Sequence, residues 1–259
     1  MLLKIIVRYR VIPLIALVIL IFNESVLSQE EVSLKGTMNV GFEAGVQFTG
    51  VDDSYVQISK GGVGFTAGPY FDYYLSNIIK FRVGINFDNR AFSLQDMDYI
   101  MDDSSYVGKS SYYDVYESFK VNYLTIPLSL IYVKGNDKFN IFIQGTFYYS
   151  IFLNANQTGY ADVYISEEDA PHFQFGDYPE LNIPGHHYLD PDIQSFSTSD
   201  IGINLLFGFT YFINPNIGIS ISPGFTYSFA NIWENPARQS TWSRIYKINT
   251  GITYKLKTN

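Results

Sequence analysis

The sequence lacks cysteine, carries few charges and has only three histidines, and each scarcity excludes something. Without cysteine the chain can form no disulfide, and it cannot be anchored as a lipoprotein through an N-terminal cysteine. Only 16% of its 259 residues are charged, which is a low fraction for a soluble domain of this size. Beyond the N-terminus no apolar run is long enough for a membrane-spanning helix, so a chain that crosses a bilayer must cross with strands.

The N-terminus has the pattern of a secretory signal peptide. Three basic residues in the first ten positions precede an apolar run over residues 11–22, and small residues lie just before Gln29. An uncleaved anchor read from Leu2 onward is the alternative, but the apolar core is shorter than the ~20 residues that span a bilayer. We therefore predict a signal peptide over residues 1–28 and one exported domain over residues 29–259.

The exported domain is acidic. Removing the signal peptide takes away three basic residues and Glu24, which leaves 14 basic and 24 acidic residues. Nucleic-acid binding requires a basic surface, so nucleic acid is excluded as a partner.

Aromatic residues are abundant, and they alternate with small polar residues. The chain has 22 Tyr and 21 Phe, and aromatic rings are enriched where membrane proteins meet the bilayer surface. Period-two alternation, typical of strands, is repeated eight times. The predicted strands cover residues 35–49, 62–74, 78–94, 119–133, 138–154, 200–213, 217–231 and 242–256.

The second face of these strands distinguishes between two all-β folds. In a soluble β-sandwich, the alternative, the solvated face is rich in charge, whereas here it is rich in Gly, Ser, Thr and Asn. Small polar residues suit the narrow interior of an eight-stranded barrel. The connections alternate between short ones (75–77, 134–137 and 214–216) and long ones (50–61, 95–118, 155–199 and 232–241).

These patterns predict an all-β fold, an eight-stranded antiparallel up-and-down transmembrane β-barrel. It has four long extracellular loops, three short periplasmic turns and both termini in the periplasm, as in bacterial outer-membrane barrels. Pro69, Pro127 and Pro223 fall inside predicted strands, where each removes a hydrogen-bond donor. We interpret them as β-bulge positions; the alternative is that one of these strands is really two pieces.

A family resemblance supports the barrel. Residues 123–128 read Y-L-T-I-P-L and resemble the Y-L-x-I-P-L signature of the PorT-like outer-membrane β-barrel family. Residues 202–231 are similar to the penultimate hairpin of that family. The resemblance implies a barrel in the bacterial outer membrane, and some members resemble components of a protein secretion apparatus. The chain departs from many outer-membrane barrels at residues 255–259, since it does not end on an aromatic residue.

The polar face of the strands contains a small set of charges that the barrel must accommodate in its lumen. They are Glu43, Asp72, Lys80, Arg82, Asp88 and Lys247. In such a barrel the first predicted strand lies beside the second and the eighth, and the second lies beside the third. Glu43 can therefore face Lys247, and Asp72 can face Arg82 or Lys80. A charge in a water-poor lumen must be paired, so we expect a structural ion network that plugs the barrel. A conductance or proton path is the functional alternative.

The loop over residues 155–199 holds all three histidines among many carboxylates and no Lys or Arg. His172, Asp177, His186, His187 and Asp190 are weak candidates for a divalent metal site. Their spacing is not that of a helical metal motif, so we expect a solvated acidic loop, no metal site and no cofactor. A looser hypothesis is that Ca²⁺ or Mg²⁺ bridges these carboxylates to lipopolysaccharide phosphates.

The same loop is rich in aromatic residues, which predicts partial order, such as an extra hairpin, and contact with a protein partner. No histidine falls on a predicted strand and no G-x-S-x-G motif is present, so we expect no enzyme. The leading hypothesis is a barrel surrounded by outer-membrane lipid and lipopolysaccharide, whose loops bind another envelope protein or a surface ligand. A role in secretion is the version that the resemblance suggests. The alternatives are a small passive pore and a lipid-modifying enzyme.

Overall fold

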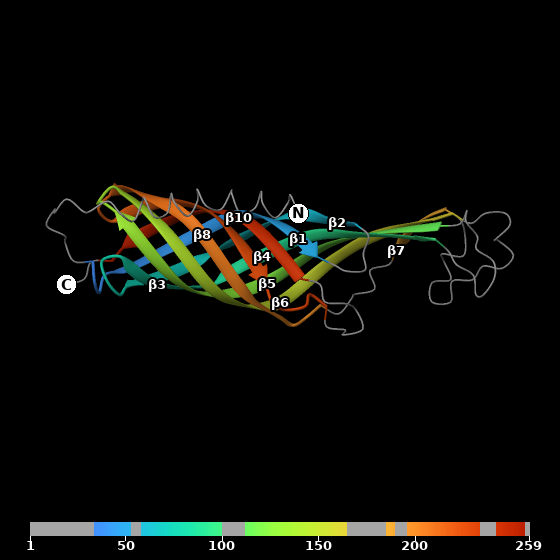
Figure 1. Cartoon of the computed structure of the whole chain (residues 1–259), viewed down its shortest axis with the longest axis horizontal. Helices are drawn as coiled ribbons and strands as arrows, with labels where there is room; N and C mark the ends of the chain where they lie inside the picture. Colours follow the sequence, from blue (N-terminus) through green and yellow to red (C-terminus); the bar gives the residue numbers. More distant parts are fainter. Residues whose placement is uncertain are drawn as a thin grey trace, which may run out of the picture. The chain divides into compact units, whose positions relative to one another are not determined.

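Antiparallel strands form a closed ring in the computed structural model of the chain (Figure 1). The structure describes residues 34–52, 58–99, 112–164, 185–189, 196–233 and 242–256, so the predicted signal peptide lies outside the described residues. Within these ranges no helix has the length and apolar character needed to cross a bilayer.

The described ranges contain ten strands in the order β1 (Met38–Asp52), β2 (Ile58–Tyr74), β3 (Ile79–Gly84), β4 (Asn86–Tyr99), β5 (Tyr112–Gly135), β6 (Phe139–Tyr164), β7 (Gly185–Leu189), β8 (Ser199–Asn214), β9 (Ile217–Ser228) and β10 (Trp242–Lys255). Each strand of the ring pairs antiparallel with its neighbours, and β1 pairs with β10 to close it. Because β3 and β4 follow one another between β2 and β5, the ring has eight strand positions. The predicted eight-stranded barrel is confirmed.

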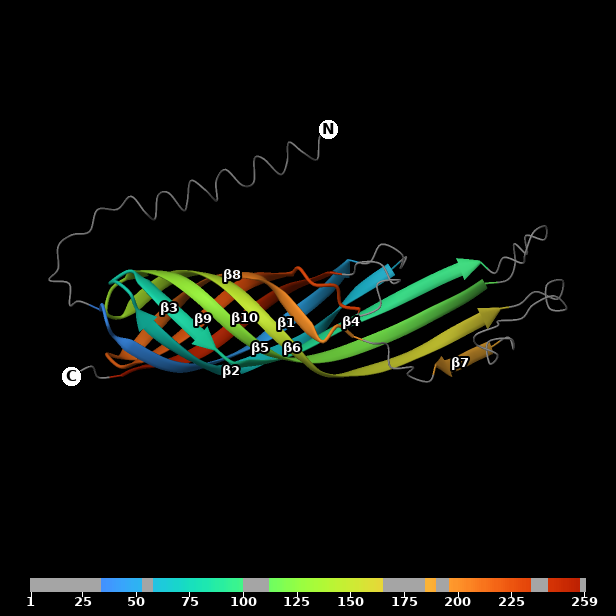
Figure 2. The same ribbon diagram turned by 90° about the horizontal axis from the view of Figure 1, so that it is seen from below.

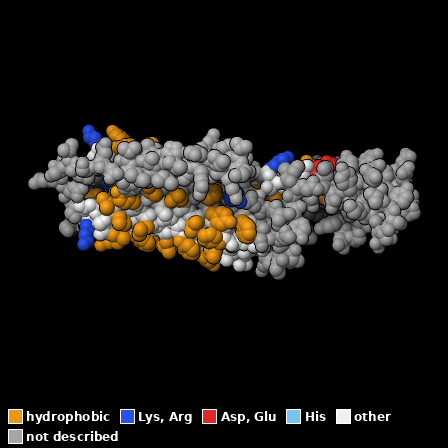
Figure 3. All heavy atoms as spheres, in the orientation of Figure 1, with side chains coloured by type: hydrophobic (Ala, Val, Ile, Leu, Met, Phe, Trp, Pro, Cys, Tyr) orange, Lys and Arg blue, Asp and Glu red, His pale blue; other side chains and the backbone are white. Residues whose placement is uncertain are grey.

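The two faces of the strands differ as the alternation predicts. Outward side chains are apolar and exposed, such as Val63 and Leu205, which are 63% and 62% exposed. Inward side chains such as Thr66, Ser129 and Asn249 are buried. In Figure 3 the apolar side chains gather over the strands of the ring. A continuous apolar surface of this kind is unfavourable in water and is the surface that a bilayer covers.

Short turns join the strands at one end of the ring, which we call the turn end; the opposite end is the loop end. Asn136 Oδ1 accepts hydrogen bonds from the backbone N–H of Lys138 and Phe139, at 3.0 and 2.9 Å. Asn214 Oδ1 does the same for Asn216 and Ile217, both at 2.9 Å. Side chains that bond to the backbone two and three residues ahead favour tight turns, so the predicted short connections form where expected.

The expectation about the prolines was wrong. The registers run through Pro69, Pro127 and Pro223 without a shift. The register shifts lie elsewhere, between Gly61 and Phe65, between Asn122 and Tyr123, and between Phe212 and Asn214.

Two of the prolines instead flank a break in the neighbouring strand. Ile85, between β3 and β4, donates its backbone N–H to the Pro69 carbonyl at 3.1 Å, but Pro69 has no N–H to donate in return. On the other side, a Cβ added to Gly84 would lie 3.3 Å from Pro127 Cγ and 3.1 Å from the Pro69 carbonyl oxygen. The interrupted strand is therefore the one formed by β3 and β4, which lies between the proline-containing strands β2 and β5. Gly84, which has no side chain, leaves room for both prolines.

Three strands continue beyond the ring at the loop end. The described strands β5 and β6 have 24 and 26 residues, and they extend past the predicted ranges 119–133 and 138–154. Residues 95–99, 112–119 and 157–164 of β4, β5 and β6, together with β7, form what we call the projecting sheet. Figure 2 shows β4, β5 and β6 running on beyond the other ring strands. The extra strand β7, paired with β6, confirms the predicted partial order in the loop over residues 155–199.

Candidate functional site

The lumen of the ring is the best-defined polar site of the chain. At its turn end, four charged side chains meet, which we call the turn-end ion cluster: Glu43, Asp72, Lys80 and Arg82. Asp72 lies on β2 opposite Arg82 of β3, because the β2–β3 hairpin sets that register. The hairpin therefore brings one carboxylate and two cations together by local sequence alone.

Asp72 is fully buried, and both of its carboxylate oxygens accept charge-assisted hydrogen bonds. Lys80 Nζ donates to Oδ2 at 2.6 Å, and Arg82 donates from Nε to Oδ1 at 2.6 Å and from Nη2 to Oδ2 at 3.1 Å. The forked Arg82 contact matches the planar geometry of a carboxylate. Because a buried charge is costly without a partner, these bonds are what makes the cluster tolerable in the lumen.

Glu43 completes the cluster from β1. Its Oε2 accepts from Arg82 Nη1 at 3.3 Å, and its Oε1 accepts from Asn86 Nδ2 at 3.2 Å. The Arg82 guanidinium also lies 3.6 Å from the centre of the Tyr70 ring. Two carboxylates and two cations balance one another, so the turn-end ion cluster is electrically neutral, and it links the neighbouring strands β1, β2 and β3.

A second set of charges lies toward the loop end, and sequence reasoning missed it. This loop-end ion cluster contains Arg90, Asp200, Tyr148 and Ser228. Arg90 Nη1 donates to Asp200 Oδ2 at 2.5 Å, Tyr148 donates to the same oxygen at 3.0 Å, and Ser228 donates to Asp200 Oδ1. Arg90 lies two residues beyond the inward Asp88, so the alternation contained a signal for it.

Lys247 does not join either cluster, which corrects the expected pairing with Glu43. The register places Glu43 opposite Gly251 and places Lys247, four residues earlier on β10, opposite Gln47. Glu43 therefore pairs with Arg82. Lys247 makes no ion pair with any residue of the described part.

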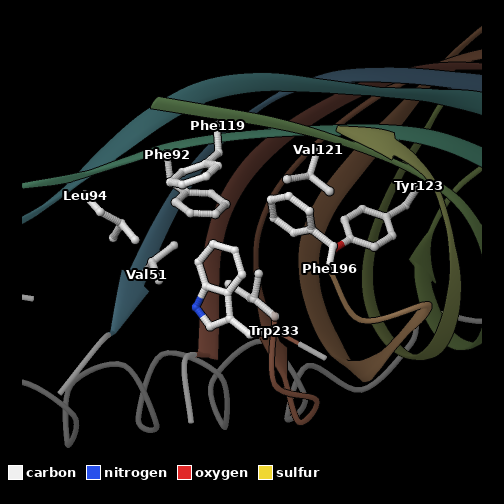
Figure 4. Close-up of a cluster of buried hydrophobic side chains, with 9 residues drawn as sticks. Val51, Phe92, Leu94, Phe119, Val121, Tyr123, Phe196 and Trp233 are labelled. Atoms are coloured by element: carbon white, nitrogen blue, oxygen red, sulfur yellow. The ribbon is translucent and has the colours of Figure 1, made fainter. Parts of the chain in front are cut away.

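An aromatic plug fills the lumen at its loop end. It consists of Val51, Phe92, Leu94, Phe119, Val121, Tyr123, Phe196, Ile232 and Trp233. Figure 4 shows the rings of Phe92 and Phe119 lying over one another, with the Trp233 indole beside them. The Phe119 and Trp233 ring centres are 5.5 Å apart, and Phe196 and Trp233, joined by a backbone bridge, are 5.0 Å apart. Sequence reasoning missed the plug because Phe196 and Trp233 lie in predicted loops.

The metal candidates are only partly described. His186 and His187 lie on β7, opposite Asp162 and Ala161 of β6. His172, Asp177 and Asp190 lie outside the described residues. The ranges that the structure describes contain no group of three or more residues that could hold a metal ion.

The charged residues of the two ion clusters bind one another. The carboxylates of both clusters accept hydrogen bonds from neighbouring cations or hydroxyls, and the two described histidines, His186 and His187, lie on β7 and not on a ring strand. The aromatic plug, the two ion clusters and a small apolar cluster of Ile131, Val133 and Phe142 lie along the lumen. Such an arrangement braces and fills a barrel.

Comparisons with known proteins agree with the fold. A family model described as outer membrane protein beta-barrel domain matches residues 27–234. No curated protein matches the chain.

Solved structures similar to the chain are also outer-membrane barrels. A major outer membrane protein from Thermus thermophilus is 14% identical, with 85% of this chain and 99% of that chain covered and a TM-score of 0.42. The outer membrane protein OprG from Pseudomonas aeruginosa is 12% identical, with coverages of 86% and 98% and a TM-score of 0.41. The outer membrane protease OmpT from Escherichia coli is 10% identical, with coverages of 88% and 100% and a TM-score of 0.36. At these identities and scores the likenesses carry no information about activity.

Proposed function

This chain belongs to the family of outer membrane protein β-barrel domains, and on this premise we propose that it is a closed, non-enzymatic barrel whose projecting sheet binds a protein partner. The protein lies in the bacterial outer membrane, where short turns face the periplasm and long connections face outward. The projecting sheet is then the part presented to the outside.

The observation that carries the proposal is the length of β5 and β6. Residues 112–118 of β5 continue past the aromatic plug, which at about 3.3 Å per residue places roughly 23 Å of paired strand beyond it. A membrane strand needs only ~9–11 residues, so crossing the bilayer does not explain this length. An ordered sheet outside the membrane is a surface for recognition.

The projecting sheet offers strand edges as well as faces. Residues 96–99 of β4 pair with β5 and with no other strand of the described part, and β7 pairs only with β6 there. Unpaired strand edges present rows of N–H and C=O groups, which an extended segment of another protein can join. A partner in a secretion apparatus, as the resemblance to the PorT-like family suggests, is one form that this binding takes.

The filled lumen favours binding over the alternative of a passive pore. The aromatic plug and the two ion clusters occupy successive levels of the lumen and are held by direct contacts. A lipid-modifying enzyme is the other alternative, and it predicts an altered lipid profile in a deletion strain. We expect that profile to be unchanged.

Photocrosslinking in intact cells tests the proposal. A photoreactive phenylalanine analogue in place of Val115 or Gly159, on the lumen-side face of the projecting sheet, is expected to give a discrete protein adduct. The control position is Leu205 of β8, an exposed side chain on the apolar outer surface. Absence of an adduct from both test positions, or the same adduct from the control, would contradict the proposal.

A further inference from the structure

A row of amides lies on the outward face of the ring where the apolar surface ends. Asn89 Nδ2 donates to Asn122 Oδ1 at 2.7 Å, and Asn122 Nδ2 donates to Asn154 Oδ1 at 2.6 Å. These residues come from the neighbouring strands β4, β5 and β6. Toward the turn end the next outward residues are apolar, among them Phe87 and Leu124. The amide row therefore marks the level at which lipid tails give way to headgroups.

Above the amide row the outward face stays polar. Lys120, which is exposed and forms no ion pair within the described part, lies opposite Asn156. Ser118 lies opposite Thr158 and shares a hydrogen bond of 3.3 Å with Ser93.

The next row contains an aromatic pair. The rings of Tyr116 and Tyr160 stack with their centres 5.2 Å apart, and Lys60 Nζ lies 5.8 Å from the Tyr116 ring. We call the whole surface the rim strip; it consists of Lys60, Asn89, Ser93, Tyr116, Ser118, Lys120, Asn122, Asn154, Asn156, Thr158 and Tyr160.

The amides of the rim strip are confined to one side of the barrel. On the opposite side, the outward residues at the loop end are mainly aromatic, including Trp242, Tyr246 and Phe229, with the exposed Arg244 among them. Aromatic residues at this level are the ordinary way for a barrel to meet the interface. The β4–β6 side adds rows of amides and hydroxyls to its own aromatic pair, and these hydrogen-bonding groups favour a polar neighbour.

We propose that the rim strip binds the phosphorylated sugar headgroup of an outer-leaflet glycolipid, of the lipopolysaccharide class. Lys120 and Lys60 supply positive charge for phosphates, and amides and hydroxyls match the hydroxyls of sugars. The stacked Tyr116 and Tyr160 rings offer a flat apolar surface to the C–H face of a sugar ring. The inference stands independently of the proposed protein partner, because the outward face of the sheet is involved and not its lumen-side face.

Binding measurements on the purified full chain in detergent test the rim strip. The probes are lipopolysaccharide, the same lipopolysaccharide after dephosphorylation, and phosphatidylglycerol. Lys120→Ala is expected to weaken lipopolysaccharide binding about fivefold, as removal of one basic residue near a charged lipid surface does. Lys138→Ala is the matched control, since Lys138 is also exposed but lies at the turn end. Asn122→Leu, which removes the centre of the amide row without changing charge, is expected to weaken the binding of both forms of lipopolysaccharide.

The outcomes separate a glycolipid site from general charge attraction. The proposal holds if Lys120→Ala loses most of its effect on the dephosphorylated probe and both rim variants leave circular dichroism unchanged. Equal weakening by Lys138→Ala would overturn it. Phosphatidylglycerol binding that equals lipopolysaccharide binding and is lost in Asn122→Leu would also overturn it, because the site would then read any anionic lipid.

Discussion

Single residues in the lumen are held by partners at two very different sequence distances. Asp72 contacts Lys80 and Arg82, which are eight and ten residues away, and the sequence was sufficient to predict these contacts because one hairpin sets them. Arg90 and Asp200 are 110 residues apart and meet across the lumen from β4 and β8. Such a pair cannot be predicted from the pairing of adjacent strands. The two residues face each other only because the ring closes and brings β4 and β8 to opposite sides of the same lumen.

The turn-end ion cluster gives a prediction at this scale. Asp72→Asn leaves Lys80 and Arg82 buried near a neutral amide, so the free energy of unfolding is expected to fall by about 3–5 kcal/mol. Thermal and denaturant unfolding of the protein in detergent measures the loss. Asp137→Asn, in the exposed turn between β5 and β6, is the control and is expected to change stability by less than about 0.5 kcal/mol. Equal stability of the two variants would show that the buried ion pairs do not hold the barrel.

At the scale of elements, the sequence predicted which face of each strand looks outward but not where each strand ends. Alternation identifies the lipid-facing residues because the apolar and polar sets rarely mix. Strand ends at the loop end escaped prediction because residues 112–118 and 155–164 mix polar and apolar side chains on both faces, so the contrast between faces is lost there. The prediction of β-bulges at the prolines failed for a related reason. A proline removes one backbone N–H, but the sequence does not show whether the neighbouring strand responds with a register shift or with a break.

The break between β3 and β4 can be tested with two glycines. Gly84→Val places methyl groups against the Pro69 carbonyl and the Pro127 ring, which is expected to cost about 1–3 kcal/mol of unfolding free energy. Gly145→Val is the matched control, because no atom lies within 4 Å of a Cβ added there. Denaturant unfolding of both variants should separate them clearly. A Gly84→Val variant as stable as wild type would mean that the prolines do not constrain this strand.

For the whole molecule, the four groups of side chains that lie in series along the lumen determine permeability. The turn-end ion cluster, the loop-end ion cluster, the aromatic plug and the small apolar cluster lie along the same path, so loss of one leaves three. The wild-type protein is therefore expected to give no steady conductance in planar bilayers. Arg82→Ala, Arg90→Ala, Phe119→Ala and Phe142→Ala are each expected to stay closed, whereas the variant that combines all four is expected to conduct. Steady conductance by the wild-type protein would refute the closed lumen and favour the pore.

Closure of the ring by β1 and β10 has a consequence for the order of events in the cell. Fourteen residue pairs join the first strand to the last, from Asn39 with Lys255 to Asp52 with Trp242. Until β10 has been synthesised and exported, β1 and β9 each keep an unpaired edge, and unpaired backbone groups are not tolerated in hydrocarbon. The barrel can therefore insert only after β10 has been exported. A truncated protein that ends before residue 242 lacks the strand that closes the ring and is expected not to insert.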